Sequence, residues 1–134
     1  MSIPKSPPAR YITSRQLIAG ADMNNLNDAS YSYQLLTPAG ATQATAVQSD
    51  AANVEIAAAA PAGGMLLPIS YPGASVNVLN NSLNTTKVYP FGTEQIQNAG
   101  TTFAAAGVAV TQATLVSTQY VCVKAGFWQR FVTG

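Results

Sequence analysis

The sequence predicts a mainly β protein: an antiparallel sandwich or jelly-roll-like barrel, preceded by an extended N-terminal arm with one or two short helices. From Ala41 onward, short segments alternate apolar and polar residues, which is the pattern of half-buried strands. Turn-forming glycine, proline and asparagine residues separate these segments at short intervals, which favours a sandwich or barrel over a parallel α/β sheet. We therefore divide the 134 residues into an arm over 1–40 and a β-sandwich domain over 41–134.

The arm begins with a proline-rich stretch and continues into a helical pattern. The prolines within residues 2–12 favour extended, polyproline-like backbone. Thr13 and Asp22 are suitable helix N-caps, and apolar residues follow each at helical spacing. We therefore expect one broken helix or two short helices over about 14–30, with a boundary near Pro38.

The remaining segments are expected to be strands. In chain order they are 42–48, 53–56, 65–69, 75–80, 86–90, 94–97, 108–111, 115–124 and 127–132. Alternate residues of a strand share a face, so Val54 and Ile56 are predicted to point into the core, as are Val76 and Val78. The alanine tract 57–60 is too short for a stable helix and is read as a strand end or a turn.

Composition argues against most enzyme classes. Charged residues make up only 8% of the chain, whereas about a quarter is typical of soluble domains. There is no histidine and only one cysteine, which excludes histidine-based triads, histidine-ligated metals and an internal disulfide. The net charge of +1 leaves no electrostatic footprint for nucleic acid or an anionic membrane. We therefore expect a structural or binding protein that is not an enzyme and has no catalytic residues, cofactor or metal.

Individual residues with chemical potential have simpler structural readings. Cys122 lies between two valines with no base to activate it, so it is expected to be a buried thiol. Asp22 and Asp28 would lie on different faces of a helix, which does not suit a shared metal. The aromatic side chains could form a sugar-stacking platform, but packing in the core and at its rim is favoured because aromatics dominate core burial. They are Tyr71, Tyr89, Phe91, Phe127, Trp128 and Phe131.

The sequence shows no recognisable targeting segment. Its start lacks the apolar core of a signal peptide, and no apolar run approaches the roughly 20 residues that cross a bilayer. We therefore expect a soluble protein that is synthesised in a cytoplasm. Low charge is unusual for a free monomer there, and it suits a chain that belongs to an assembly.

Residues 41–130 resemble a β module of tailed-bacteriophage virion proteins. That module has a Leu-Pro step, a Gly-x-x-Val-x-Val-x-Asn strand, a Val-Tyr-Pro step, an Ala-Gly loop, and a Tyr- and Cys-bearing strand that ends in Gly-x-Trp. The matching residues here are Leu67-Pro68, Gly73–Asn80, Val88-Tyr89-Pro90, Gly92, Ile96-Gln97, Ala106-Gly107, Tyr120-Val121-Cys122 and Gly126-Phe127-Trp128. The chain departs from the pattern at Gln97, where the module has Asn, and in the aromatic Phe127 before the tryptophan.

The resemblance implies a capsid decoration (cement) protein, which binds the outside of the major capsid shell and stabilises it by bridging capsomers. It implies a location on the virion exterior, with the major capsid protein and further copies of this chain as partners. A trimer is favoured over a dimer. The alternative is a carbohydrate- or receptor-binding module of a head fibre or tail. Neither reading involves nucleic acid or a membrane.

In a decoration protein, the arm would lie across neighbouring capsid subunits and bury its apolar side chains there. The residues expected to make these contacts are Arg10, Ile12, Arg15, Leu17, Ile18, Met23, Leu26, Tyr31, Tyr33, Leu35 and Leu36. The two arginines would pair with acidic groups of the shell. The alternative is that this segment folds back onto its own sandwich.

Overall fold

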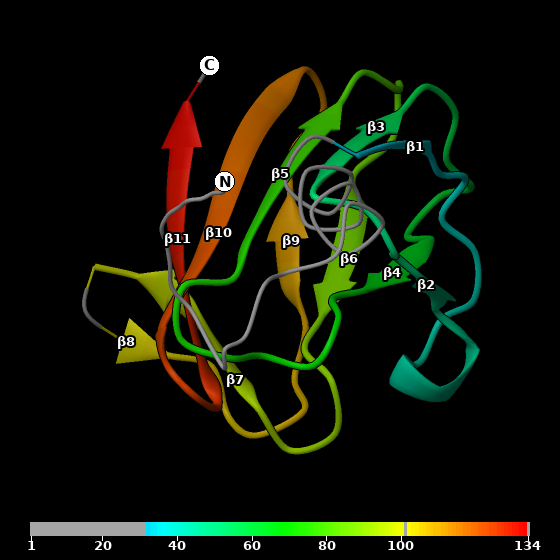
Figure 1. The fold of residues 1–134 in the computed structure, drawn as a ribbon. Coiled ribbons are helices and arrows are strands. Elements are labelled where there is room, and N and C mark those ends of the chain that lie inside the picture. Colours follow the sequence, from blue (N-terminus) through cyan, green and yellow to red (C-terminus); the bar gives the residue numbers. More distant parts are fainter. Residues whose placement is uncertain (1–31, 101, 134) are drawn as a thin grey trace, which may run out of the picture. The chain divides into compact units, whose positions relative to one another are not determined.

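The computed structural model describes residues 32–133 apart from residue 101 (Figure 1). The chain divides into two units at Ser32 and Tyr33, and the unit Tyr33–Gly134 contains the described fold. The helical segment predicted over 14–30 and the proline-rich start of the arm lie outside the described residues.

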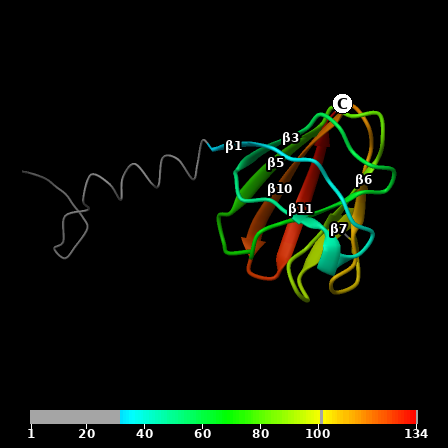
Figure 2. The same ribbon diagram turned by 90° about the vertical axis from the view of Figure 1, so that its right-hand side faces the viewer.

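Within the described residues, the chain forms strands with one short 3-10 helix. The elements are β1 (Tyr33–Leu35), η1 (Gln43–Thr45), β2 (Val47–Gln48), β3 (Asn53–Ile56), β4 (Gly64–Leu66), β5 (Ser75–Asn80), β6 (Thr86–Tyr89), β7 (Gln95–Ala99), β8 (Thr102–Phe103), β9 (Val110–Gln112), β10 (Val116–Lys124) and β11 (Phe127–Thr133). They form a seven-stranded sheet, the large sheet, in the order β1-β3-β5-β10-β11-β7-β8, and a four-stranded small sheet in the order β2-β4-β6-β9. Figure 2 shows β1, β3, β5, β10 and β11 side by side in the large sheet.

The predicted two-sheet β fold is confirmed, but the expected antiparallel pairing is corrected, because both sheets are mixed. The chain alternates between the sheets from β1 to β6, so successive strands of one sheet run in the same direction. β1, β3 and β5 are therefore parallel neighbours, as are β2, β4 and β6. Antiparallel pairing enters later in the chain, where β7 pairs with β8, β9 pairs with β6, and β10 pairs with both β5 and β11. From β1 to β6, the chain thus winds back and forth between the two sheets.

The core lies between the two sheets. The inward residues predicted from alternation are confirmed, since Val54 and Val76 are 3% exposed and Ile56 and Val78 are 0% exposed. Cys122 is buried as expected. The other large core side chains are Leu36, Met65, Leu67, Val88, Ile96, Val110, Tyr120 and Trp128. Every predicted strand segment overlaps an observed strand, whereas β1 and β8 had no predicted counterpart.

The predicted domain boundary at residue 40 is also corrected, because residues 33–40 belong to the β domain. β1 pairs in parallel with β3. Leu36 is only 2% exposed within the core, and its N–H donates to the carbonyl of Glu55 over 2.9 Å. The β domain therefore begins at Tyr33.

Asn80 organises the turn that follows β5 from a fully buried position. Its amide nitrogen donates to the carbonyls of Asn84 and Ala113, over 2.9 and 3.1 Å. Its amide oxygen accepts from the N–H and the hydroxyl of Ser82, over 3.1 and 2.7 Å. The amide nitrogen makes both donor bonds and the amide oxygen makes both acceptor bonds. The position therefore needs a side chain that has a donor and an acceptor side by side.

Gln112 makes a second buried polar cluster beside the core. Its amide nitrogen donates to the carbonyls of Val78 and Val116, over 2.8 and 2.9 Å. Its oxygen accepts from the hydroxyl of Tyr120 over 3.0 Å. Because each buried group has a partner, the cluster joins β5, β9 and β10 without leaving unpaired polar atoms on these side chains.

Tyr120 gives the fold a predicted alkaline limit. Burial raises the pKa of its phenol well above the ordinary value of 10.0, although Arg130 and Thr118 act in the opposite direction. Because this pKa is raised in the folded state, the contribution of Tyr120 to the free energy of unfolding is complete below the unfolded pKa. That contribution is lost as pH rises toward the folded pKa. We expect the free energy of unfolding to fall above pH 10.0, and to fall less steeply in Tyr120→Phe. Urea unfolding at a series of pH values measures both slopes, and equal slopes would contradict the assignment.

Candidate interaction surface

The described residues offer no candidate metal site. Nowhere among them do three or more His, Cys, Asp or Glu residues come close enough to hold a metal ion. Helices long and apolar enough to span a membrane are also absent from this part of the chain. The large sheet, in contrast, presents a broad surface, because one of its sides faces away from the core.

We call this side the outer face. Its members alternate with the core residues along each strand, and the register places them in rows across the sheet. They are Tyr33, Leu35, Asn53, Glu55, Ser75, Asn77, Leu79, Ser117, Gln119, Val121, Val123, Lys124, Phe127, Gln129, Phe131 and Thr133. Several of its apolar side chains are open to solvent: Val123 is 65% exposed, Leu35 60% and Phe131 53%. The outer face is thus a continuous sheet surface with apolar side chains distributed over it.

Neighbouring polar side chains on the outer face bond to each other. The amide nitrogen of Asn77 donates to the amide oxygen of Asn53 over 3.1 Å, from β5 to β3. The amide nitrogen of Gln119 donates to the hydroxyl of Ser75 over 3.3 Å, from β10 to β5. A polar group that already has a partner loses less when it is taken out of water. These pairs lower the cost of covering the outer face with another protein surface.

Two opposite charges lie at opposite ends of the outer face. Glu55 pairs in register with Leu79 near the end of β5, and it accepts a hydrogen bond from the hydroxyl of Tyr33 over 2.8 Å. That bond raises the pKa of Tyr33. Lys124 lies at the other end of the face, on β10, past the point where β10 pairs with the start of β5. Its Nζ is 5.0 Å from the ring centroid of Phe127.

The other charged residues of the described chain lie away from the outer face. They are Asp50 in a loop, Lys87 on the small sheet, Glu94 beside Ser70 and Trp128, and Arg130, which donates to the carbonyl of Thr111. Glu55 and Lys124 are therefore the charged members of the outer face among the described residues.

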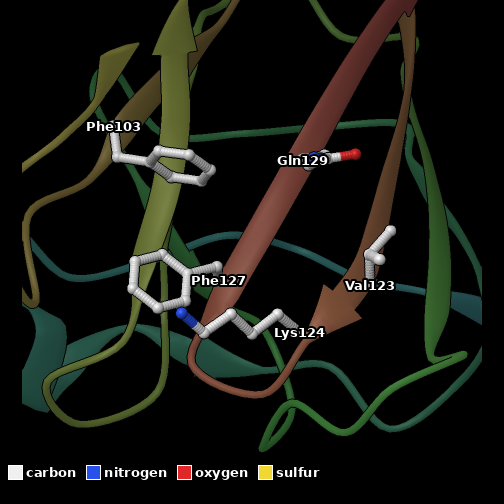
Figure 3. Close-up of a pocket in the computed structure, with 5 residues that line it drawn as sticks. All are labelled: Phe103, Val123, Lys124, Phe127 and Gln129. Carbon is white, nitrogen blue, oxygen red and sulfur yellow. The ribbon is translucent and has the colours of Figure 1, made fainter. Parts of the chain in front are cut away.

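A hollow of about 290 Å³ indents the outer face beside Lys124 (Figure 3). It is lined by Phe103, Val123, Lys124, Phe127 and Gln129. The rings of Phe103 and Phe127 meet edge to face, with centroids 5.3 Å apart at 80°. A register shift between Cys122 and Lys124 interrupts the alternation of β10, so Val123 and Lys124 both line the hollow. The hollow suits an apolar side chain that has an acidic neighbour.

Comparison with known proteins found no matching family model, no similar curated protein and no similar solved structure.

The aromatic residues divide between core and surface. Trp128 is 0% exposed and Tyr89 is 8% exposed, so neither ring is available to stack on a sugar. Tyr71, Phe91 and Phe131 are exposed. The predicted preference for core and rim packing is therefore confirmed for Trp128 and Tyr89. These two rings cannot belong to a sugar-stacking platform.

The residues predicted to contact a capsid differ in where the structure places them. Those outside the described residues are Arg10, Ile12, Arg15, Leu17, Ile18, Met23, Leu26 and Tyr31. Tyr33 and Leu35 are exposed on β1. The prediction for Leu36 is corrected, because its side chain packs in the core and is closed to a partner. The alternation along 33–36 indicates this burial, since Tyr33 and Leu35 share one face and Leu36 lies on the other.

Sequence reasoning missed the outer face. Leu79, Val123 and Phe131 are apolar residues at strand positions opposite to the core-facing ones, and this pattern could have marked them. Their assembly into one surface depends on the order of the strands in the large sheet.

Proposed function

We propose that the protein is a structural, non-enzymatic component of a large protein assembly, of the capsid decoration kind. The observation that carries the proposal is the outer face, where exposed apolar side chains alternate with polar groups that already bond to one another. Such a surface is suited to being covered by protein. The low content of charged residues, 8% of the chain, supports the same conclusion.

The resemblance of residues 41–130 to a virion module supports the choice of assembly. In this proposal the protein sits on the exterior of a virion, and the major capsid protein is its partner. The β domain is a rigid body that adds contact area, and residues 1–32 are the arm that binds the shell. Arg10 and Arg15 would meet acidic groups there, and further copies of the chain would complete the layer.

Removal of residues 1–32 tests this role for the arm. The cut leaves β1 and Leu36 in place, whereas a cut at residue 35 or 40 would remove part of the β domain. We expect the shortened chain to keep its β-type circular dichroism and to lose sedimentation with purified shells. Mass spectrometry against the major shell protein would count the copies bound.

Two further variants make that result interpretable. Arg10→Ala with Arg15→Ala in the full chain should weaken shell binding without any truncation. Leu83→Ser is the matched control, since Leu83 is 92% exposed in a turn and should bind like the wild type. Shell binding that survives the removal of residues 1–32 would refute the arm as the attachment site.

A further inference from the structure

We propose that the outer face of the large sheet pairs with the same face of a second copy of this chain, in a two-fold symmetric dimer. This contact goes beyond the proposed attachment to a shell, because it needs no shell and is a property of the protein in solution. Four observations carry it: the extent of the face, its bonded polar groups, the placement of its two charges, and the hollow beside one of them.

The outer face offers a broad area for a contact. Strands lie about 4.8 Å apart and rise about 3.3 Å per residue, so the five strands β1, β3, β5, β10 and β11 give a projected area of roughly 20 by 20 Å. The protruding side chains add accessible surface to this projection. The face therefore supplies a large part of the roughly 800 Å² per partner that a standard interface buries.

The two charges favour a second copy over another partner. In a two-fold contact the same patch is used by both copies, so residue i meets residue j and residue j meets residue i. Glu55 and Lys124 lie at opposite ends of the outer face. An axis that runs across the strands, tilted so that β3 of one copy crosses β10 of the other, exchanges these ends, and each Lys124 then lies opposite the second copy's Glu55. Both charges of the face are thereby paired with one operation.

The same axis brings an apolar side chain to the hollow. Leu79 is 41% exposed and lies beside Glu55 in the register, on the side toward β10. The hollow lies beside Lys124 on the side toward β11, where Phe127 lines it. An axis across the strands keeps this lateral direction, so Leu79 of one copy reaches the hollow of the other. The hollow thus receives Leu79, an apolar residue beside the acidic Glu55, which is the kind of neighbour that its lining suits.

Charge reversal tests the dimer in the full-length protein. Sedimentation equilibrium should give a dimer for the wild type. Lys124→Glu and Glu55→Lys should each weaken the dimer by about tenfold or more, because each places like charges opposite each other. Lys87→Glu, on the small sheet, is the matched control and should leave the dimer unchanged.

An equimolar mixture of the two variants provides the decisive measurement. In a mixed dimer, both contacts again join opposite charges, so the mixture should associate at wild-type concentrations although each variant alone does not. A monomeric wild type, a dimer or trimer insensitive to both reversals, or a mixture that stays monomeric would overturn the proposal. Shell binding is measured separately, so its loss or survival does not decide this one.

Discussion

The variant Asn80→Asp is expected to lose about 3–5 kcal/mol of stability at neutral pH, because it buries a charge whose second oxygen faces carbonyls instead of donors or a cation. The substitution changes almost no volume. It replaces a donor that contacts the carbonyls of Asn84 and Ala113 with an oxygen that they repel. The fully buried site offers no water to the new carboxylate.

The pH dependence identifies the cause of this loss. Burial without a cation raises the pKa of the introduced carboxyl group above the ordinary value of about 4. The loss should therefore be complete well above neutrality and should shrink as pH falls, because a protonated carboxyl is neutral and donates to one carbonyl. Urea unfolding followed by circular dichroism at several pH values measures this.

The neighbouring residue supplies the control for Asn80. Asn81 carries the same side chain and is exposed, so Asn81→Asp should change the free energy of unfolding by less than about 0.5 kcal/mol. Equal losses in the two variants, or a loss in Asn80→Asp that ignores pH, would show that the amide pairing does not hold the turn.

Trp128→Ala is expected to cost about 3–5 kcal/mol, the range for removing a large aromatic side chain from a core. Trp128 is 0% exposed and lies opposite Cys122 in the register of β10 and β11. Its indole nitrogen is 3.4 Å from Glu94, whose carboxylate also accepts from the hydroxyl of Ser70 over 3.0 Å. The variant would therefore open a cavity and also leave one oxygen of Glu94 with fewer donors.

Phe131→Ala provides the comparison on the same strand. Phe131 is 53% exposed on the outer face, so its truncation should cost less than about 1 kcal/mol of monomer stability. Its effect should appear instead as weaker dimer formation. Denaturant unfolding at low protein concentration separates stability from association, and losses of equal size would contradict the placement of the two rings.

Much of the strand pattern follows from local chemistry. The alternation at Val54 and Ile56 predicts both the strand and its buried face, because the period of two is a property of a few consecutive residues. Turn residues are equally local. Gly73 and Gly126 have φ of 93° and 90°, which glycine adopts without strain, and each lies where a turn was predicted.

Short strands were missed because three residues hold too little pattern. β1 contains three residues and β8 contains two, so neither shows more than one alternation. Leu36 was assigned to the arm for this reason. Its burial depends on β3, whose Glu55 carbonyl bonds to the N–H of Leu36.

The amino-acid pattern specifies which residues are buried and where the chain turns, since both depend on neighbours in sequence. The direction and order of the strands follow from a different cause. β1 to β6 alternate between two sheets, so the partner of each strand is set by non-local contacts and is parallel rather than antiparallel. The outer face arises in the same way. Glu55 and Lys124 belong to β3 and β10, and they share one surface because β5 lies between these strands in the large sheet.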